Sequence, residues 1–164
     1  MKKNKLAKEI YNVSNIKGEF LLRSGQISNE YFDKYLFESK PDLLREIGNH
    51  MKSLLPDKFD VLAALEMGGI PVATVISLKT GYPVVKLAEG AEVSGKKLVI
   101  IEDVVTSGGA ILDAAKELRK LGAEIDIVLC VIDREGTGKE NLAKEGLKLI
   151  PLFTKSELEE AVKS

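Results

Sequence analysis

Two adjacent carboxylates followed by a turn of small residues form the most informative pattern in the sequence. The apolar run Leu98–Ile101 leads into Glu102 and Asp103, and the Thr-Ser-Gly-Gly turn Thr106–Gly109 precedes a helical pattern. Carboxylates accept hydrogen bonds from sugar hydroxyls, and backbone N–H groups of a glycine-containing turn at a helix N-terminus can bind phosphate. The pattern therefore predicts a site that holds a sugar and its phosphate side by side.

An ordinary strand-to-helix turn is the alternative, in which both acids are solvated and the glycines only provide flexibility. The complete order of strand, two acids, two apolar residues, small turn and helix favours the binding site. Two other phosphate-binding patterns are missing from the sequence, which contains neither the P-loop pattern GxxxxGK followed by Ser or Thr nor the dinucleotide spacing GxGxxG.

Three further segments place polar or glycine residues next to expected elements. The glycines of Glu66–Gly69 let the backbone approach an anion at the start of a helix, although a simple turn is equally consistent with them. Arg134 could bind a planar carboxylate by two parallel hydrogen bonds, but a surface ion pair with a neighbouring acid is the simpler local interpretation. The segment Gly18–Asp33, which includes Arg23, mixes aromatic residues with a Ser-Gly pair. It could cover a flat ring or form an irregular surface loop.

Composition narrows the possible chemistry. The chain has 164 residues, with 24 basic and 25 acidic side chains, so its charge gives no basis for binding nucleic acid or a membrane. Cys130 and His50 are the only residues of their types, which makes a zinc site or a Ser-His-Asp triad improbable. The N-terminus lacks the apolar stretch of a signal peptide, and we expect a cytoplasmic protein.

Apolar patterns along the chain predict alternating strands and helices. The expected strands show little alternation of apolar and polar residues, which is typical of a parallel sheet covered on both faces. We therefore predict an α/β fold with a doubly wound, mostly parallel sheet whose ligands lie at the carboxyl ends of the strands. The segment Gly18–Phe37 is expected to be a loop with short strands. The strands are Val61–Leu65, Tyr82–Val85, Leu98–Ile101, Ile125–Ile132 and Leu147–Leu152; helices are expected near 3–14, from Pro41, from Ile70 to Lys79, over Ile111–Leu121 and Lys139–Glu145, and after a capping box at Thr154.

Together these segments resemble one family, the orotate phosphoribosyltransferases, among the type I phosphoribosyltransferases. Glu102–Ala110 resembles the motif that binds phosphoribosyl pyrophosphate (PRPP), and Glu66–Pro71 resembles the pyrophosphate loop. Phe20–Tyr31 follows the family's N-terminal pattern Phe-x-Leu-(Lys/Arg)-Ser-Gly-x-x-Ser-x-x-Tyr, and Asp133–Glu135 and Leu152–Leu158 are similar to its C-terminal part. The likeness spans nearly the whole chain. The N-terminal pattern and the Asp-Arg-Glu segment are what single out orotate.

The resemblance implies a type I phosphoribosyltransferase fold with a small N-terminal hood. Residues 1–164 would form one domain, with a hood contribution from about 1–40 and an α/β core over 41–164. It also implies a homodimeric pentosyltransferase that converts orotate and PRPP to orotidine 5′-monophosphate and pyrophosphate, the penultimate step of pyrimidine nucleotide synthesis. Magnesium would be bound through PRPP.

The resemblance also implies residue roles. Glu102 and Asp103 would bind the ribose hydroxyls and, as the catalytic carboxylates, favour the cationic ribose of the reaction. Thr106 and Arg134 would contact orotate, with Arg134 facing its carboxylate, and Arg23 would approach the base or the ribosyl group. No side chain is assigned as a dedicated metal ligand, and Asp103 is the one considered. The PRPP site would comprise Glu102, Asp103, Val104, Val105, Thr106, Ser107, Gly108, Gly109 and Ala110, and the pyrophosphate loop Glu66, Met67, Gly68 and Gly69.

One connection departs from the family pattern. Between the strands at Tyr82–Val85 and Leu98–Ile101, the family carries a long basic loop that closes over PRPP and supplies a lysine to the leaving pyrophosphate. Here the connection is residues 86–96 alone, and Lys86–Gly90 matches the segment that comes after the loop in the family. Three interpretations are open: a segment missing from this sequence, a deletion that impairs catalysis, or binding of PRPP without turnover. We favour the first two and expect the chain as printed to be slow.

Two other functions stay open at this point. A phosphoribosyltransferase for another base would share the PRPP segment but would need no arginine facing a carboxylate. A PRPP-binding regulator or inactive paralogue is the second alternative, which the near-neutral charge and the lack of a helix-turn-helix extension disfavour.

Overall fold

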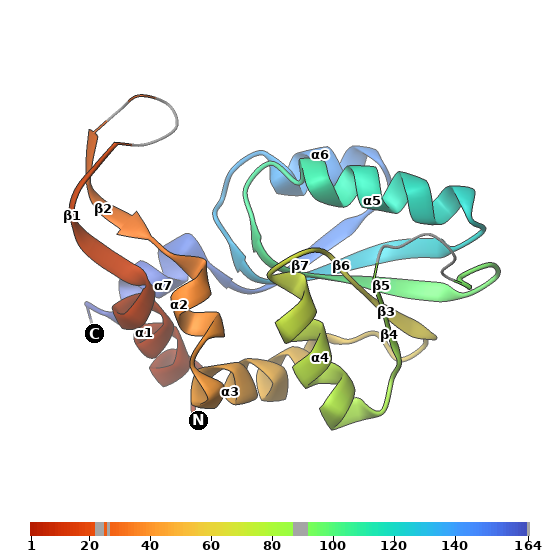
Figure 1. Ribbon diagram of the computed structural model, residues 1–164, viewed down its shortest axis with the longest axis horizontal. Coiled ribbons are helices and arrows are strands. Elements are labelled where there is room, and N and C mark those ends of the chain that lie inside the picture. Colours follow the sequence, from red (N-terminus) through yellow and green to blue (C-terminus); the bar gives the residue numbers. More distant parts are fainter. Residues whose placement is uncertain (22–24, 26, 87–91, 164) are drawn as a thin grey trace.

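A five-stranded parallel sheet forms the centre of the molecule (Figure 1). The computed structural model describes residues 1–21, 25, 27–86 and 92–163. Within them the strand order is β4-β3-β5-β6-β7, and every neighbouring pair is parallel. The α/β prediction with a doubly wound sheet is thereby confirmed. The strands are β3 (Val61–Ala64), β4 (Val84–Lys86), β5 (Lys97–Val105), β6 (Glu124–Asp133) and β7 (Lys148–Thr154).

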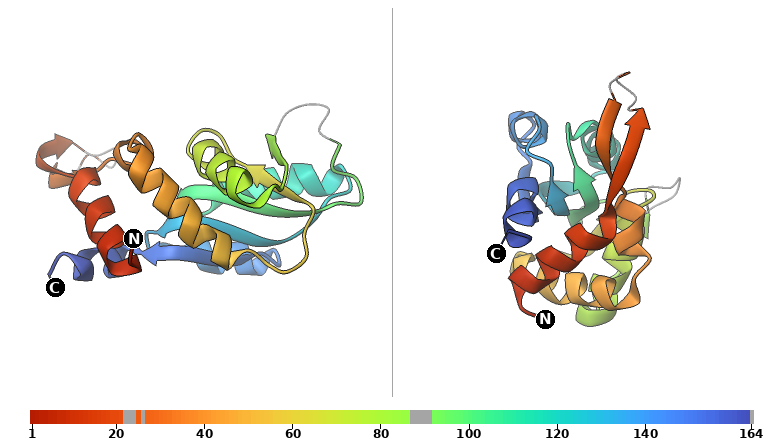
Figure 2. Two further views of the ribbon diagram at one scale, coloured as in Figure 1. Left: turned by 90° about the horizontal axis from the view of Figure 1, so that it is seen from below. Right: turned by 90° about the vertical axis from the view of Figure 1, so that its left-hand side faces the viewer.

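Helices cover both faces of the sheet. α3 (Pro41–Met51) and α4 (Gly69–Thr80) lie on one face, and α5 (Gly109–Lys120) and α6 (Gly138–Lys144) lie on the other (Figures 1 and 2). Alternate residues of one strand enter two different apolar clusters: Leu62 packs with the α4 side, and Val61 packs with the α5 side. Burial on both sides explains why these strands show no polar alternation.

A two-stranded hairpin and two short helices complete the N-terminal part. α1 (Lys3–Ser14) is followed by the antiparallel strands β1 (Asn15–Leu21) and β2 (Ile27–Phe32), then by α2 (Lys34–Glu38). The hairpin projects from the body of the molecule on the side toward which the strands of the large sheet point (Figure 1). The expected loop with short strands is thus a hairpin followed by a helix.

The first and last helices pack together. α7 (Lys155–Ala161) contacts α1, and Leu6 and Ile10 of α1 belong to the same apolar cluster as Ile47 and Phe153 (Figure 2). The segment 1–40 therefore shares an apolar core with the rest of the chain, and its division into hood and core stays a prediction. A single 3-10 turn, η1 (Lys52–Leu54), follows α3.

Several local predictions are confirmed at the ends of elements. Gly81 ends α4 with a φ of 80°, in the left-handed region that glycine adopts most readily. The capping box at Thr154 is present: its Oγ1 accepts from Glu157 N at 3.2 Å, and its N donates to Glu157 Oε2 at 2.8 Å. No helix of the described residues has the length and apolar character needed to span a membrane.

One boundary differs in a way that matters for the site. β5 continues past Ile101 to Val105, so Glu102 and Asp103 lie inside the strand and not after its end. The reason is the neighbouring strand: β6 extends to Asp133 and pairs with β5 up to Val105. The two acids therefore lie on a backbone that is fixed by the sheet, with Glu102 opposite Cys130 of β6.

Candidate active site

Loops that follow β3, β5 and β6 meet at one edge of the sheet. These strands are neighbours in the order β3-β5-β6, and their carboxyl ends face the side of the molecule that carries the hairpin (Figure 1). In open α/β sheets this edge is where ligands bind. The predicted pyrophosphate loop, the predicted PRPP turn and Arg134 all follow these strands.

Contacts from the neighbouring loop and helix fix the turn after β5. Gly138 N donates to Thr106 O at 2.8 Å, and Asn141 Nδ2 donates to Ser107 O at 3.1 Å. Gly108 has a φ of 76° and directly precedes α5. The turn is thus held through its carbonyl oxygens, whereas a phosphate would bind to N–H groups at the start of α5.

The segment after Arg134 approaches this turn closely. A Cβ atom on Gly136 would lie 2.6 Å from Thr106 O, and one on Gly138 would lie 2.9 Å from the same atom. Both positions therefore require glycine. The sequence prediction did not include Gly136, Gly138 or Asn141, although the Gly-Thr-Gly spacing after Asp-Arg-Glu was visible in the sequence.

The predicted pyrophosphate loop lies directly against β5. A Cβ atom on Gly69 would overlap Ile101 O, and one on Gly68 would overlap Asp103 Oδ2. The peptide bond between Glu66 and Met67 is cis. The two predicted loops are thus brought together, with Asp103 next to Gly68.

Asp103 is the most buried acid of the site and is paired with a residue of the N-terminal part. Its side chain is 0% exposed, and its Oδ2 lies 2.6 Å from Lys34 Nζ of α2. Its Oδ1 accepts from Val104 N at 2.6 Å. Glu102, which is 8% exposed, accepts from Asp103 N through Oε1 at 2.9 Å. Glu38 of α2 also reaches this cluster, because its Oε1 lies 2.8 Å from the position of a Cβ on Gly68.

Burial and mutual contact set the protonation of these acids. Burial, together with the hydrogen bond and charge of Asp103, raises the pKa of Glu102 to about 9. The same causes raise the pKa of Glu38 to about 8. Burial acts to raise the pKa of Asp103, but hydrogen bonds from Glu102, Glu38 and Lys34 outweigh it and lower that pKa. At neutral pH the cluster therefore contains one carboxylate, on Asp103, and one ammonium, on Lys34.

A hollow of about 240 Å³ lies between the hairpin, α1, α7 and the end of β6. Arg134, which is exposed, lines it together with the aromatic residues Tyr31 and Phe32 of β2. Tyr11, Ile132 and Lys155 are among its other lining residues. The hollow thus offers aromatic rings and a guanidinium group, which suit a flat ligand with a negative charge.

Hydrogen bonds to α7 hold the backbone that follows Arg134. Glu135 has a φ of 58°, which is uncommon for a residue with a side chain. Its Oε2 accepts from Ser156 N at 2.8 Å and from Ser156 Oγ at 2.6 Å, and these bonds lower the pKa of Glu135. Its N donates to Asp133 Oδ1 at 2.9 Å. Both neighbours of Arg134 are therefore fixed.

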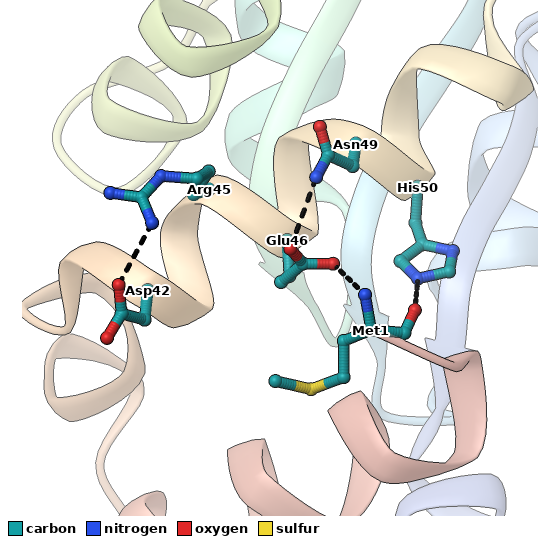
Figure 3. A network of polar contacts seen from close by, with 6 residues as sticks. All are labelled: Met1, Asp42, Arg45, Glu46, Asn49 and His50. Carbon is teal, nitrogen blue, oxygen red and sulfur yellow. Dashed lines mark hydrogen bonds and ion pairs between the residues drawn. The ribbon is translucent and has the colours of Figure 1, made fainter.

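The single histidine lies in a different network. His50 Nε2 is 2.9 Å from Met1 O, and the Met1 amine pairs with Glu46 Oε2 at 2.5 Å (Figure 3). These contacts join α3 to the start of the chain and involve none of the loops described above. Among the described residues, no cluster of three or more His, Cys, Asp or Glu side chains is suited to hold a metal ion by itself.

Comparison with known proteins gives the site its context. The model of the phosphoribosyl transferase domain family matches residues 79–160. An orotate phosphoribosyltransferase of Nocardioides sp. is 48% identical over 168 residues, covering 95% of this chain and 94% of its own length. One from Methanocella arvoryzae is 41% identical, covering 86% and 87%. The chain belongs to the orotate phosphoribosyltransferase family.

Solved structures agree with this assignment. The orotate phosphoribosyltransferase of Mycobacterium tuberculosis H37Rv in complex with inorganic phosphate has a TM-score of 0.87 at 30% identity, covering 96% of this chain and 98% of its own. The same protein in complex with PRPP has a TM-score of 0.84 at 29% identity, with the same coverage. The predicted type I phosphoribosyltransferase fold is thereby confirmed.

Two sequence predictions fall in the parts of the chain that the structure does not describe. Arg23 lies outside the described residues, as do residues 87–91 of the short connection after β4. The alignment with the Nocardioides orotate phosphoribosyltransferase spans 168 positions, more than the 164 residues of this chain. That relative therefore has residues without a counterpart here, and the shortened loop stays a prediction.

Proposed function

We propose that this protein transfers the 5-phosphoribosyl group from PRPP to orotate and releases pyrophosphate. The observation that carries the proposal is the buried Asp103 carboxylate, placed between the glycine loop at Gly68 and the turn at the start of α5. This arrangement puts a hydrogen-bond acceptor for sugar hydroxyls between two sites for phosphate groups. Family membership supports the choice of PRPP as the donor.

The donor would lie along the carboxyl edge of the sheet. The turn Thr106–Ala110 would bind the 5-phosphate with backbone N–H groups, and the hydroxyls of the ribose would donate to Glu102 and Asp103. The ionised Asp103 lies inside β5, where its Oδ1 accepts from Val104 N, and it would lie close to the sugar. Its charge would therefore stabilise the positive charge that develops on the ribose as pyrophosphate leaves.

The acceptor would occupy the hollow between the hairpin and the end of β6. Arg134 would bind the carboxylate of orotate, and Tyr31 and Phe32 would lie against the ring. Arg134 N donates to Val105 O at 2.9 Å, so Thr106, the residue after Val105, lies near the start of the Arg134 turn. Thr106 would therefore contact the same base. A base without a carboxylate would leave Arg134 unpaired in the complex.

We further propose that magnesium binds with the donor. Magnesium prefers oxygen ligands and is usually held by one or two carboxylates plus substrate phosphates, and the ionised Asp103 could supply one such carboxylate. When bound, the ion would neutralise charge on the pyrophosphate. The residues of the chain would position the sugar and exclude water.

We also propose a homodimer. α4 carries the exposed apolar side chain Leu78, which is 82% exposed, and Met67 just before α4 is 68% exposed. The support for the dimer is the resemblance to a homodimeric family, and these two side chains are candidates for its contact surface. The cytoplasmic location stays a prediction from the sequence.

The test is pyrophosphate release by the purified protein with PRPP, in the presence and absence of orotate. We expect release that depends on orotate and not on adenine or xanthine, at a slow rate because the basic loop of the family is shortened. Release with a purine alone would favour a phosphoribosyltransferase for another base. PRPP binding without any release would favour the non-catalytic regulator or paralogue.

A matched pair of variants tests the acceptor site. Arg134→Ala removes the proposed contact with the carboxylate and should weaken orotate binding by about 10- to 100-fold, because a hydrogen-bonded charge pair contributes about 1.5–3 kcal/mol. PRPP binding should persist. Lys139→Ala, on the exposed surface of α6, serves as the control. Unchanged orotate affinity in Arg134→Ala would remove this residue from the acceptor site.

A further inference from the structure

The two loops proposed to hold the donor contain no basic residue. Neither Glu66–Pro71 nor Glu102–Ala110 includes a lysine or an arginine, and both begin with acids. A pyrophosphate group carries several negative charges, while the start of a helix contributes only about half a positive charge. A basic side chain from elsewhere in the chain would therefore strengthen donor binding, in addition to the magnesium proposed above.

Lys34 is the basic side chain that reaches this place. Its Nζ lies 2.6 Å from Asp103 Oδ2, and among the described ion pairs it is the only partner of a donor-site acid. The Lys34 side chain is 34% exposed, whereas Asp103 is 0% exposed. The ammonium thus lies at the outer side of the pair, where an incoming ligand can contact it.

The same ammonium lies next to the pyrophosphate loop. Asp103 Oδ2, the atom that pairs with Lys34, occupies the space where a side chain on Gly68 would be. Lys34, Asp103 and the backbone of Gly68 therefore share one small volume, with no side chain at Gly68 to separate them. An ammonium has three N–H donors, so the bond to Asp103 leaves two for other acceptors.

Lys34 lies on the same short segment as a residue that lines the hollow proposed for the base. α2 follows β2 directly, and Asp33 caps it by accepting from Tyr35 N at 3.0 Å. Phe32 lines the hollow proposed for the base, and two residues later Lys34 pairs with Asp103 of the proposed donor site. One short segment of the N-terminal part therefore reaches both proposed substrates.

We propose that Lys34 is a donor-binding residue whose ammonium contacts the pyrophosphate group of PRPP at Gly68 while it stays paired with Asp103. This inference rests on the proposed function, because it assigns the site to PRPP. Lys34 supplies from the α2 segment a positive charge that the donor loops lack. It acts on the pyrophosphate end of the donor and not on the 5-phosphate end.

Calorimetric binding with PRPP, pyrophosphate and ribose 5-phosphate, at one magnesium concentration, separates these two ends. Lys34→Gln should weaken binding of PRPP and pyrophosphate by about 10- to 100-fold, the effect of losing a charge-assisted hydrogen bond. Binding of ribose 5-phosphate should change by less than about twofold, and Lys34→Arg should restore part of the loss. Lys40→Gln, an exposed lysine at the start of α3, is the control and should match the wild type.

Equal losses for PRPP and ribose 5-phosphate would overturn the inference, since Lys34 would then act only by holding Asp103. Unchanged PRPP affinity in Lys34→Gln would overturn it as well and would leave the proposed function intact. A wild type that binds orotate but no PRPP would overturn both.

A measurement on the wild type covers the case in which Lys34→Gln does not fold. Pyrophosphate should slow acylation of the Lys34 amine, mapped by peptide mass spectrometry, without slowing that of Lys40. Unchanged or faster acylation of Lys34 would contradict the proposed contact.

Discussion

Replacing Glu38 by glutamine should change how the stability of the protein depends on pH. Burial and the contact with Asp103 raise the pKa of Glu38 from 4.5 to about 8. Between these values the unfolded chain loses this proton while the folded protein keeps it, so the free energy of unfolding falls as pH rises. Below pH 4.5 both states are protonated, and the effect disappears. Glutamine has the shape of the protonated acid, keeps a donor for Asp103 and does not titrate.

The size of the effect follows from the shift. A shift of one pKa unit corresponds to about 1.36 kcal/mol. For a fully buried, isolated carboxyl with this shift, the free energy of unfolding would fall by about 5 kcal/mol as the pH rises from the lower to the higher pKa. Glu38 is only half-buried, and solvent screening reduces the value, so we expect about 1–2 kcal/mol. Glu38→Gln should therefore match the wild type near pH 5 and exceed its stability by that amount near pH 8.

Urea unfolding at several pH values, with a chelator and no ligand, measures this difference. Glu19→Gln, on the exposed face of β1, is the control and should follow the wild type at every pH. The lowered pKa of Asp103 changes the free energy of unfolding only below about pH 3.8, outside the range from pH 5 to pH 8 that is compared here. Parallel curves for Glu38→Gln and the wild type would refute the argument, and so would a variant that is less stable at pH 8.

Three further variants test the site. Gly136→Ala places a Cβ 2.6 Å from Thr106 O and should lower the unfolding free energy by about 1–3 kcal/mol, measured by urea titration. Asp103→Asn removes the ionised acceptor of the ribose and should weaken PRPP binding at least about tenfold by calorimetry, with the fold retained in circular dichroism. Glu135→Gln weakens the bonds from Ser156 that hold the Arg134 turn, so orotate affinity should fall a few-fold while PRPP affinity stays unchanged.

Local patterns were sufficient to predict most of the fold. The strands of the large sheet are apolar on both faces, and the ends of helices carry local signals, such as Gly81 and the capping box at Thr154. The order of strands and helices then restricts the topology to a parallel sheet, which places the loops at Gly68 and Thr106 at one edge. These predictions needed only neighbouring residues and general rules of connection.

The charge environment of the site could not be obtained in this way. Lys34 and Glu38 are separated from Asp103 by more than sixty residues of sequence, and they reach it because α2 packs beside the carboxyl end of β5. Nothing in the spacing of a lysine and a glutamate on a short helix distinguishes them from surface residues. Likewise, the length of β5 depends on pairing with β6, which the sequence around Glu102 does not reveal.

Because Glu102 and Asp103 lie inside a strand, the proposed site has two parts. The part that would bind the sugar is fixed by the sheet, and the part that would bind the base can be changed separately. The pairing of β5 with β6 fixes the strand that carries both acids, while the surfaces that would meet the base come from a separate hairpin and from the turn at Arg134. Remodelling of the hairpin can therefore alter which ring is accepted without displacing the anchor for the sugar. Redesign toward a different acceptor should begin at Tyr31 and Phe32 and leave the sheet untouched.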